Sequence, residues 1–297
     1  MKKDLSNIKK SKFFLNRNEC IGIPTETVYG LAANAYSDLA TSKIFKLKKR
    51  PKNNPLIVHY YSLEKLKKDC KINQNFIKLY KKFCPGPITF ILKLKSKNKI
   101  SKNVTNKKKT LAVRFPSHSL TRKLLKELDF PLAAPSANIS TKVSAVSKKD
   151  VEEEFGNKIK FILDGGSSKI GLESTIVNLD PKPAILRLGA IEVSKINKVL
   201  KNKVKYKSNN NQNIVPGQGK LHYSPGIKIR RNIKNPKKHE AFLLIKKRKI
   251  SDKNFFYLTK NNNLNEAGKN LYRTLRMIKK LKYNSCLLYT SPSPRDW

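Results

Sequence analysis

A chain of 297 residues is long enough for about two domains, and its hydrophobic content of 38% can fill their cores. It contains 65 Lys and Arg against 20 Asp and Glu, so its formal net charge is +45, a balance that usually indicates a nucleic-acid partner. The basic residues are spread along the whole length among many Asn and Ile, and Lys, Asn and Ile share A/T-rich codons. We therefore attribute the excess charge to an AT-rich genome, keep weak RNA binding as an alternative, and expect an anionic substrate.

The spacing of cysteines and histidines excludes the common zinc sites. The four cysteines form no CxxC pair, and the four histidines are far apart in the sequence. No stretch approaches the roughly 20 apolar residues that a membrane span requires, and the charged N-terminus is followed by an amphipathic segment. We expect a cytoplasmic location in a reducing compartment and no membrane partner.

Helices and strands alternate along the first two thirds of the chain. The apolar pattern predicts helices at 5–19, 38–49, from 62, 76–83, 119–128, up to 155 and at 192–200, and strands at 20–24, 55–60, 88–94, 110–115, 131–135, 161–166, 174–179 and 184–188. Polar loops are expected at 25–32 and between the strands at 88–94 and 110–115. Asp38 is expected to cap its helix, and Ser147 with Asp150 resembles a capping box. This interleaving predicts an α/β fold, a mixed sheet with helices on its faces.

The last third changes in character twice. Residues 201–213 are polar and rich in Asn, which is typical of a linker. Strands at 241–245 and 255–258 and a helix at 266–280 then begin a small second α/β domain. The stretch from Cys286 to Trp297 contains no Lys, Asn or Ile and resembles a translated sequencing adapter. We therefore expect four regions, 1–203, 204–226, 227–285 and 286–297, with the last outside the native fold and the second domain truncated.

A basic cluster precedes one of the predicted buried strands, in the stretch Lys48-Lys49-Arg50-Pro51-Lys52-Asn53-Asn54-Pro55-Leu56-Ile57-Val58-His59. Pro51 disfavours helix at the residue before it, so the helix should end here. Three cations at a helix end form a plausible anion receptor. The alternative is a solvated basic face, which is the default in a lysine-rich chain.

Any nucleotide must be held by side chains and strand-end loops, because no Walker A pattern and no GxGxxG after the first strand is present. Polar residues at predicted strand ends are candidates, since ligand crevices of α/β sheets lie there. They are Thr25, Arg50, His59, Arg114, Ser136 and Asn138. Singly, each has an ordinary structural explanation: a cap for Thr25, a hydrogen-bonded core residue for His59, a surface ion pair for Arg114, and a turn for Ser136 and Asn138.

Read together, these segments resemble the L-threonylcarbamoyladenylate synthase family. The matching motifs occur in the family's order over residues 5 to about 200. They are Pro24-Thr25-Glu26-Thr27-Val28-Tyr29-Gly30-Leu31, Lys48-x-Arg50-Pro51-x3-Pro55-Leu56-Ile57-Val58-His59, Pro85-Gly86-Pro87-Ile88-Thr89, Leu111-Ala112-Val113-Arg114-Phe115-Pro116, Pro135-Ser136-Ala137-Asn138-Ile139-Ser140 and Glu173-Ser174-Thr175-Ile176-Val177. His222-Tyr223-Ser224-Pro225 resembles the interdomain linker of the two-domain branch, and residues 271–276 resemble a helix of its C-terminal domain.

The resemblance implies a YrdC-like mixed twisted sheet with helices on its faces, then a linker and a partial small Rossmann-like α/β domain. It also implies an enzyme, a nucleotidyltransferase that condenses L-threonine, bicarbonate or CO2 and ATP, with Mg2+ on the phosphates, into L-threonylcarbamoyl-AMP and pyrophosphate. The product would be handed to the tRNA threonylcarbamoyl transferase complex, which modifies the adenosine beside the anticodon of ANN-decoding tRNAs.

The resemblance further implies two sets of binding residues. Threonine would be held by Thr25, His59, Arg114, Ala134 and Ser174. ATP would be held by Lys48, Arg50, Asn54, Thr110, Ser136, Asn138, Ser144 and Arg187, with Tyr223 closing the site from the linker. Lys48 and Arg50 would be the catalytic cations, whereas Lys49 and Lys52 would face solvent.

One loop departs from the family pattern, because many members have Gly where this chain has Thr141. We therefore expect that loop to sit differently. Two other functions are compatible with a domain of this kind. One is a module for double-stranded RNA or ribosome assembly that uses the same basic cavity, and the other is the carbamoyl-adenylate step of hydrogenase maturation. The latter is disfavoured, because those proteins carry additional acylphosphatase-like and zinc-finger regions.

Overall fold

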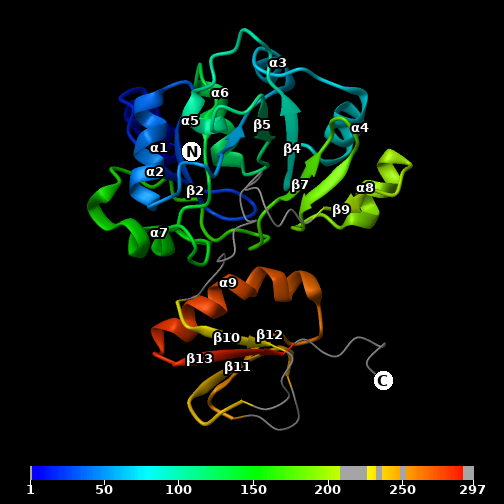
Figure 1. Ribbon diagram of the computed structural model, residues 1–297. Helices are drawn as coiled ribbons and strands as arrows, with labels where there is room; N and C mark the ends of the chain where they lie inside the picture. The colour runs from blue at the N-terminus through cyan, green and yellow to red at the C-terminus, as the bar shows by residue number, and fades with distance from the viewer. Residues whose placement is uncertain (1, 208–225, 232–235, 248–251, 290–297) are drawn as a thin grey trace. The chain divides into compact units, whose positions relative to one another are not determined.

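The computed structural model describes residues 2–207, 226–231, 236–247 and 252–289, which form two compact units (Figure 1). The first unit runs from α1 to β9. Its elements are α1 (Lys2–Asn16), β1 (Ile21–Ile23), β2 (Gly30–Asn34), α2 (Asp38–Lys48), β3 (Ile57–His59), α3 (Leu63–Lys67), α4 (Gln74–Phe83), β4 (Ile88–Lys93), α5 (Lys102–Thr105), β5 (Thr110–Arg114), α6 (Ser119–Glu127), β6 (Leu132–Ala133), α7 (Lys148–Phe155), the 3-10 turn η1 (Gly156–Lys158), β7 (Thr175–Asn178), β8 (Ala184–Arg187), α8 (Val193–Leu200) and β9 (Lys205–Tyr206).

The first unit is built on a nine-stranded sheet in the order β1-β2-β6-β3-β5-β4-β7-β8-β9. Its pairs are parallel for β3/β5, β4/β7 and β8/β9 and antiparallel elsewhere. Helices α1, α2 and α7 lie toward one end of the sheet and α4 and α8 toward the other (Figure 1). The predicted mixed α/β fold is confirmed.

The two faces of this sheet are packed very differently. Because side chains alternate along a strand, Val58, Val113 and Phe90 share one face, where they join the large core that includes Ile44 of α2 and Phe76 of α4. The opposite face carries a small separate cluster, made of Ile57, Ile91, Ala112, Ile176, Ala184 and Leu186. His59 and Arg114 each lie two residues beyond a member of this cluster, on its strand and on its face.

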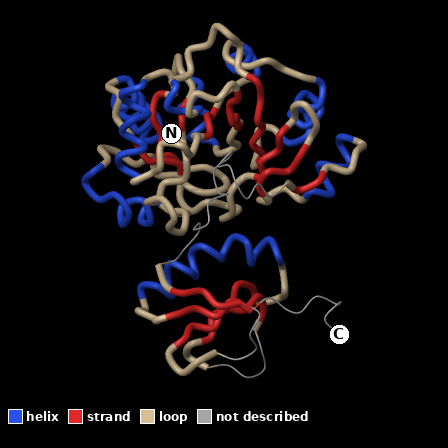
Figure 2. Tube along the Cα trace, in the orientation of Figure 1, coloured by secondary structure: helices blue, strands red, loops and turns tan. Residues whose placement is uncertain are grey.

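The second unit is a four-stranded parallel sheet in the order β10-β13-β11-β12, with α9 packed on β12 and β11 (Figure 2). Its elements are β10 (Lys228–Arg231), β11 (Glu240–Lys246), β12 (Phe255–Thr259), α9 (Leu264–Lys280) and β13 (Ser285–Tyr289). Residues 286–289 of the expected adapter-like tail therefore form most of a strand that pairs with both β10 and β11. Residues 290–297 lie outside the described part.

Several local expectations were wrong. The polar loop expected at 25–32 contains the start of β2, and the loop expected before residue 110 contains the helical turn α5. Ser37, not Asp38, is the N-cap of α2, because the Ser37 hydroxyl accepts the amide of Ala40. Residues 161–166 form no strand but only an isolated bridge between Ile162 and Gly22.

One other local feature follows the sequence pattern. Ser147 and Asp150 form the predicted capping box at the start of α7, where each side chain accepts the other residue's amide. No helix in the described ranges is both long and apolar enough to cross a membrane.

The first strand of the second unit is attached through a buried carboxylate. Glu240 of β11 accepts hydrogen bonds from both Arg230 of β10 and Ser285 of β13, and it is 1% exposed. The hydrogen bond from Arg230 outweighs burial and lowers the pKa of Glu240 to about 2. One side chain therefore joins three of the four strands.

We expect this unit to lose stability in acid. The folded pKa of Glu240 is depressed, so its stabilising contribution is complete above the ordinary value of 4.5 and is lost as the pH falls toward about 2. The protection factors for hydrogen exchange of the β11 amides should fall over that range. Glu240→Gln should raise exchange at pH 7 and flatten the acid dependence, whereas Asp252→Asn, at an exposed carboxylate, should change neither. An unchanged acid profile in Glu240→Gln would contradict this role.

Candidate active site

A row of polar residues crosses the sheet on the face of the small apolar cluster. His59 of β3 is paired with Arg114 of β5, which is paired with Thr89 of β4. The Thr89 hydroxyl lies 2.7 Å from that of Ser174, the residue just before β7. Directly paired residues share a face, so the sheet itself brings His59, Arg114 and Thr89 into one line, and the hydroxyl contact adds Ser174.

Arg114 is held from one side by a buried carboxylate. Its Nη2 lies 2.7 Å from Oε1 of Glu26, and both side chains are less than 10% exposed. Burial alone would raise the pKa of Glu26, but the charge and hydrogen bond of Arg114 keep it below its usual range. Arg114 Nε has no hydrogen-bond partner among the described residues. Arg114 is thus a buried ion-pair partner rather than a surface one, and its Nε is available to a ligand.

His59 also has an unused buried nitrogen. The residue is 2% exposed, and its Nδ1 has no partner in the described part of the chain. Burial, and then the neighbouring charge of Arg114, lower the pKa of His59 well below its ordinary value, so the ring is neutral at pH 7. A hydrogen-bonded core histidine would leave no such nitrogen, and this explanation of His59 is therefore wrong.

The end of α2 is fixed to the loop after β6 by Lys48. Its ammonium, 1% exposed, donates to the backbone carbonyls of Ser136, at 2.6 Å, and Asn138. The amide of Ser140 in turn donates to the Lys48 carbonyl at 2.8 Å. Burial, and then Arg50, lower the pKa of Lys48 well below its usual range. An anion placed nearby would favour the charged form of Lys48.

Arg50 is buried two residues further on. Its guanidinium donates to the Asn54 side chain at 2.5 Å and to the Pro55 carbonyl at 2.9 Å. Burial, and then the nearby Arg187, lower the pKa of Arg50 to about 9, so it stays charged at pH 7. Lys49 and Lys52 are exposed, as expected.

Arg187 connects these cations to the polar row. It donates through Nη2 to the Ser174 carbonyl at 2.8 Å and to the Ser174 hydroxyl at 3.1 Å. The register between β7 and β8 shifts at this point, which places Arg187 opposite Ile176, on the face of the apolar cluster. The site therefore runs continuously from Lys48 and Arg50, through Arg187 and Ser174, to Arg114 and His59.

Other candidate residues make hydrogen bonds within the protein. The Thr25 hydroxyl accepts the amides of Thr27 and Val28 at 3.2 Å, so it organises its own turn. Ser144 donates to Glu173 at 2.5 Å, and the Ala134 amide donates to Ile57 at 2.9 Å.

Two candidates are not gathered with the others. Thr110 lies at the other end of β5, on the same face as Arg114 but about 13 Å along the strand. Tyr223 lies outside the described residues.

The loop with the family departure keeps a backbone conformation typical of glycine. Thr141 has φ of 75°, in the left-handed region that β-branched residues rarely adopt. We expect the loop to sit differently because of Thr141, and this residue adopts the left-handed conformation one residue after Ser140. No cluster of His, Cys, Asp or Glu in the described ranges could hold a metal ion by itself.

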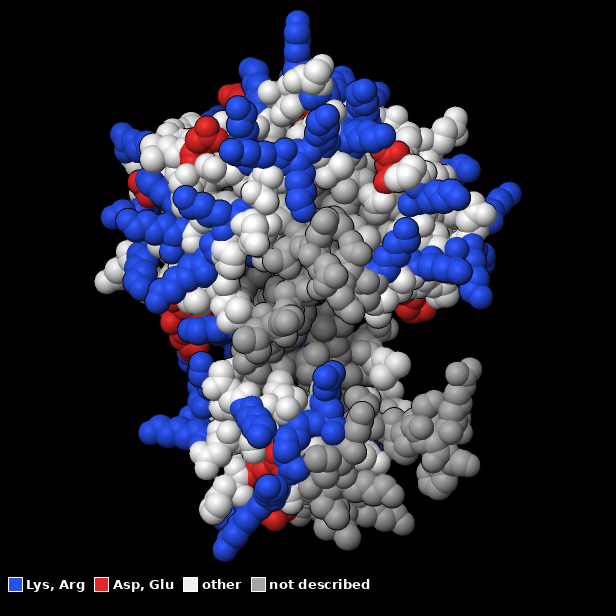
Figure 3. All heavy atoms as spheres, viewed as in Figure 1, with Lys and Arg blue, Asp and Glu red and all other residues white. Residues whose placement is uncertain are grey.

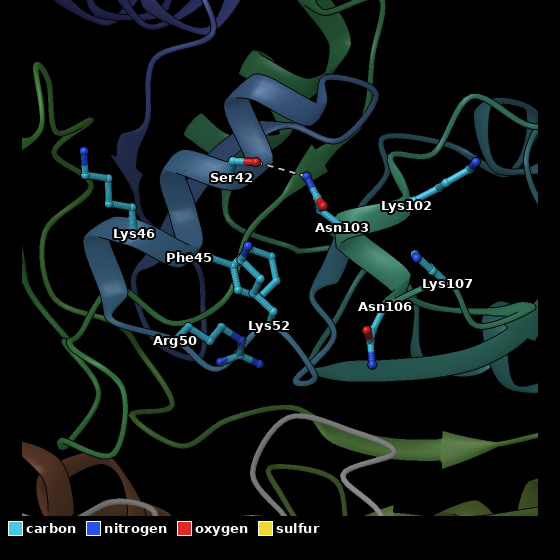
Figure 4. A pocket seen from close by; sticks show the side chains of 9 residues that line it. All are labelled: Ser42, Phe45, Lys46, Arg50, Lys52, Lys102, Asn103, Asn106 and Lys107. Carbon is cyan, nitrogen blue, oxygen red and sulfur yellow. Dashed lines mark hydrogen bonds between the residues drawn. The ribbon is translucent and has the colours of Figure 1, made fainter.

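A hollow of about 670 Å³ lies beside Arg50, away from the polar row (Figure 4). Figure 4 shows residues of α2 and its following loop on one side and residues of α5 on the other, joined by a hydrogen bond from Asn103 to Ser42. Its lining comprises Ser42, Phe45, Lys46, Arg50, Lys52, Lys102, Asn103, Asn106 and Lys107. It shares only Arg50 with the site.

Sequence reasoning missed Glu26 and Thr89 as members of this site. Both occur in motifs that it quoted, Pro24 to Leu31 and Pro85 to Thr89. The available signal was an acid or hydroxyl in an otherwise apolar context, but nothing in the sequence shows that Glu26 pairs with Arg114.

Two family models together match most of the chain. A family model for Sua5, YciO and YrdC, described as "Telomere recombination", matches residues 14–189. A second, described as "Threonylcarbamoyl-AMP synthase, C-terminal domain", matches residues 191–295. The threonylcarbamoyl-AMP synthases of Pyrococcus abyssi and Bacillus subtilis are 38% and 39% identical to this chain, covering 73% of it in each case and 65% and 64% of the relatives. The chain thus spans slightly less than two thirds of these curated relatives.

A solved structure extends the similarity to both units. The crystal structure of P. abyssi Sua5 complexed with L-threonine is 32% identical and matches with a TM-score of 0.87, covering 96% of this chain and 89% of that one. The chain therefore belongs to the Sua5/YrdC family, in the two-domain branch that carries the Sua5 C-terminal domain.

Proposed function

We propose that this protein is an L-threonylcarbamoyladenylate synthase, which condenses L-threonine, bicarbonate or CO2 and ATP into L-threonylcarbamoyl-AMP and pyrophosphate. The names of its relatives support this proposal. The observation that carries it is a difference in charge between the two halves of one continuous site. Around Arg114 the cation is already paired with Glu26, whereas Lys48 and Arg50 are buried cations whose hydrogen bonds within the described residues go to backbone carbonyls and to the side chain of Asn54.

The half around Arg114 suits a small amino acid. The unpartnered Nε of Arg114 would bind the threonine carboxylate, and the Nδ1 of neutral His59 would bind its hydroxyl or amine. Thr25, Ala134 and Ser174 would complete the wall. This assignment uses the two buried nitrogens that the protein itself leaves without partners.

The other half suits a triphosphate. Lys48, Arg50 and Arg187 would neutralise its charge, while Asn54, Ser136, Asn138 and Ser144 would supply polar contacts. The apolar patch of Ile57, Ala112 and Ile91 would accommodate the base, with Thr110 at its far end. Mg2+ would be held mainly by the phosphates, because the described residues offer no metal cluster. Tyr223 would close the site.

The chemistry needs positioning and charge more than a protein nucleophile. The threonine amine attacks CO2 and loses a proton, which gives a carbamate. A carbamate oxygen then attacks the α-phosphorus of ATP while the bond to the β-phosphate oxygen breaks, and pyrophosphate leaves. Lys48 and Arg50 would stabilise the negative charge that develops at phosphorus. The product would pass to the tRNA threonylcarbamoyl transferase complex, in the cytoplasm.

The proposed reaction has a direct test. Protein incubated with ATP, Mg2+, bicarbonate and L-threonine should release pyrophosphate, and omission of threonine should abolish the release, because the attacking carbamate cannot form. A coupled pyrophosphate assay with mass spectrometry of the adenylate measures both products. Release of pyrophosphate without threonine would overturn the proposal.

We expect Arg50→Ala to lower kcat/KM at least about tenfold more than Lys49→Ala. Arg50 is buried next to Arg187, whereas Lys49 is exposed and ends α2 in the left-handed conformation. Both variants remove one cation from the same helix end, so they are matched for net charge. Equal losses would show that the cluster acts through general attraction rather than through Arg50.

One observation favours RNA binding as a second function. The hollow in Figure 4 and a neighbouring hollow of about 770 Å³ share Lys102 and Lys107, and no carboxylate lines either one. Against this, Figure 3 shows Lys and Arg distributed over the whole visible face of the first unit. Solvated lysines therefore remain the simpler explanation.

A charge reversal separates the two explanations. If RNA phosphates bind here, Lys102→Glu with Lys107→Glu should weaken binding of a short RNA duplex and make its salt dependence less steep by about 2 in the log–log slope. Lys78→Glu with Lys82→Glu, on the exposed face of α4, is the matched control. Fluorescence anisotropy measures both. Equal effects of the two pairs would leave only non-specific attraction.

A further inference from the structure

Glu26 has no role in the reaction as proposed, yet it is completely engaged within the site. Its Oε1 accepts from Arg114 at 2.7 Å, and its Oε2 accepts the backbone amide of Ser117 at 3.0 Å. The side chain is buried, so its charge acts on Arg114 with little screening by water. If Arg114 served only to bind an anionic ligand, Glu26 would compete with that ligand for the guanidinium and weaken its binding.

Arg114 and the three side chains on which its charge acts, Glu26, His59 and Cys84, together sum to zero charge. Glu26 cancels Arg114, and His59 is neutral for the reasons given above. Burial raises the pKa of the Cys84 thiol to about 12 and lowers the pKa of His118, so both are neutral at pH 7.

Two further cations act on these groups from the edge. Lys169 is exposed, and Arg122 is half-buried over the ring of Tyr61, where it donates to the Tyr61 carbonyl. Among the described residues no salt bridge joins either cation to Glu26, so the buried ion pair consists of Arg114 and Glu26 alone.

We propose that Glu26 sets the charge selectivity of this pocket, so that it accepts a zwitterionic amino acid and rejects a carboxylic acid that lacks the ammonium group. The inference rests on the proposed function, because it concerns the threonine half of the same site.

The reason is the cost of an unbalanced charge away from water. A zwitterion brings a carboxylate to Arg114 together with an ammonium, and the pocket stays neutral. A simple hydroxy acid brings only the carboxylate, which would leave Glu26 and the ligand sharing one guanidinium with a net negative charge. Arg114 alone would have the opposite preference. Glu26 therefore converts a carboxylate receptor into an amino-acid receptor.

The test compares two ligands that differ only in the amine. L-Threonine and 3-hydroxybutyrate of the matching configuration are titrated calorimetrically into the full chain without ATP. The wild type should bind threonine more tightly. Glu26→Gln keeps the size and one acceptor oxygen but removes the charge, so it should weaken threonine and tighten 3-hydroxybutyrate, each by about tenfold or more, a change of about 1.4 kcal/mol per tenfold.

Two control variants separate an effect of the Glu26 charge from a loss of local structure. Glu26→Asp keeps the negative charge and should retain the preference for threonine even if both ligands bind more weakly. Glu127→Gln, at an exposed carboxylate of α6, should leave both affinities unchanged. A merely structural role for Glu26 would weaken both ligands together in Glu26→Gln and leave their ratio unchanged, which would overturn the proposal.

The outcome is distinguishable from failure of the proposed reaction. Wild-type protein that selects threonine over the hydroxy acid but releases no pyrophosphate would contradict the synthase and support the role of Glu26. Threonine-dependent pyrophosphate release combined with an unchanged ratio of the two affinities in Glu26→Gln would support the synthase and contradict the role of Glu26. A wild type that binds 3-hydroxybutyrate as tightly as threonine would also overturn the role of Glu26.

Discussion

The site depends on one buried ammonium. Removing the charge of Lys48 from water is costly unless its hydrogens are all directed at acceptors, and the carbonyls of Ser136 and Asn138 provide two of them. The Ser140 amide returns a hydrogen bond to the Lys48 carbonyl, so helix end and loop are mutually fixed. With Lys48 turned inward, the exposed Lys49 must point outward, and Arg50 can then turn back toward the sheet.

The two halves of the site differ in their buried charges: one holds several cations, and the other holds the ion pair of Arg114 and Glu26. Burial, and then repulsion from a neighbouring cation, lower the pKa values of Lys48 and Arg50. Around Arg114 the repulsion is absent, because Glu26 cancels the charge locally. The two halves therefore differ in charge although they share one face and are joined through Ser174.

The sequence predicted some parts of this arrangement because local rules decide them. Pro51 ends α2, and the alternation of Lys48, Lys49 and Arg50 around a helix end follows from that. The interleaving of helical and strand patterns along the chain predicted the mixed sheet. Strand β10 was missed, because its residues 228–231 are charged and largely exposed and so show no alternation. The sequence could not show that His59 Nδ1 lacks a hydrogen-bond partner in the described part of the chain, because this depends on which residues the fold places beside it.

The polar row across β3, β5 and β4 places a constraint on how this enzyme fold can vary. His59, Arg114 and Thr89 are aligned by strand pairing and not by a shared loop. Inserting or deleting one residue within these strands would turn one member of the row into the hydrophobic core, whereas the same change in the lysine-rich connection after β4 would leave the row intact. Evolutionary length variation should therefore concentrate in the connections, and grafting the row into another protein would require transplanting paired strands rather than a motif.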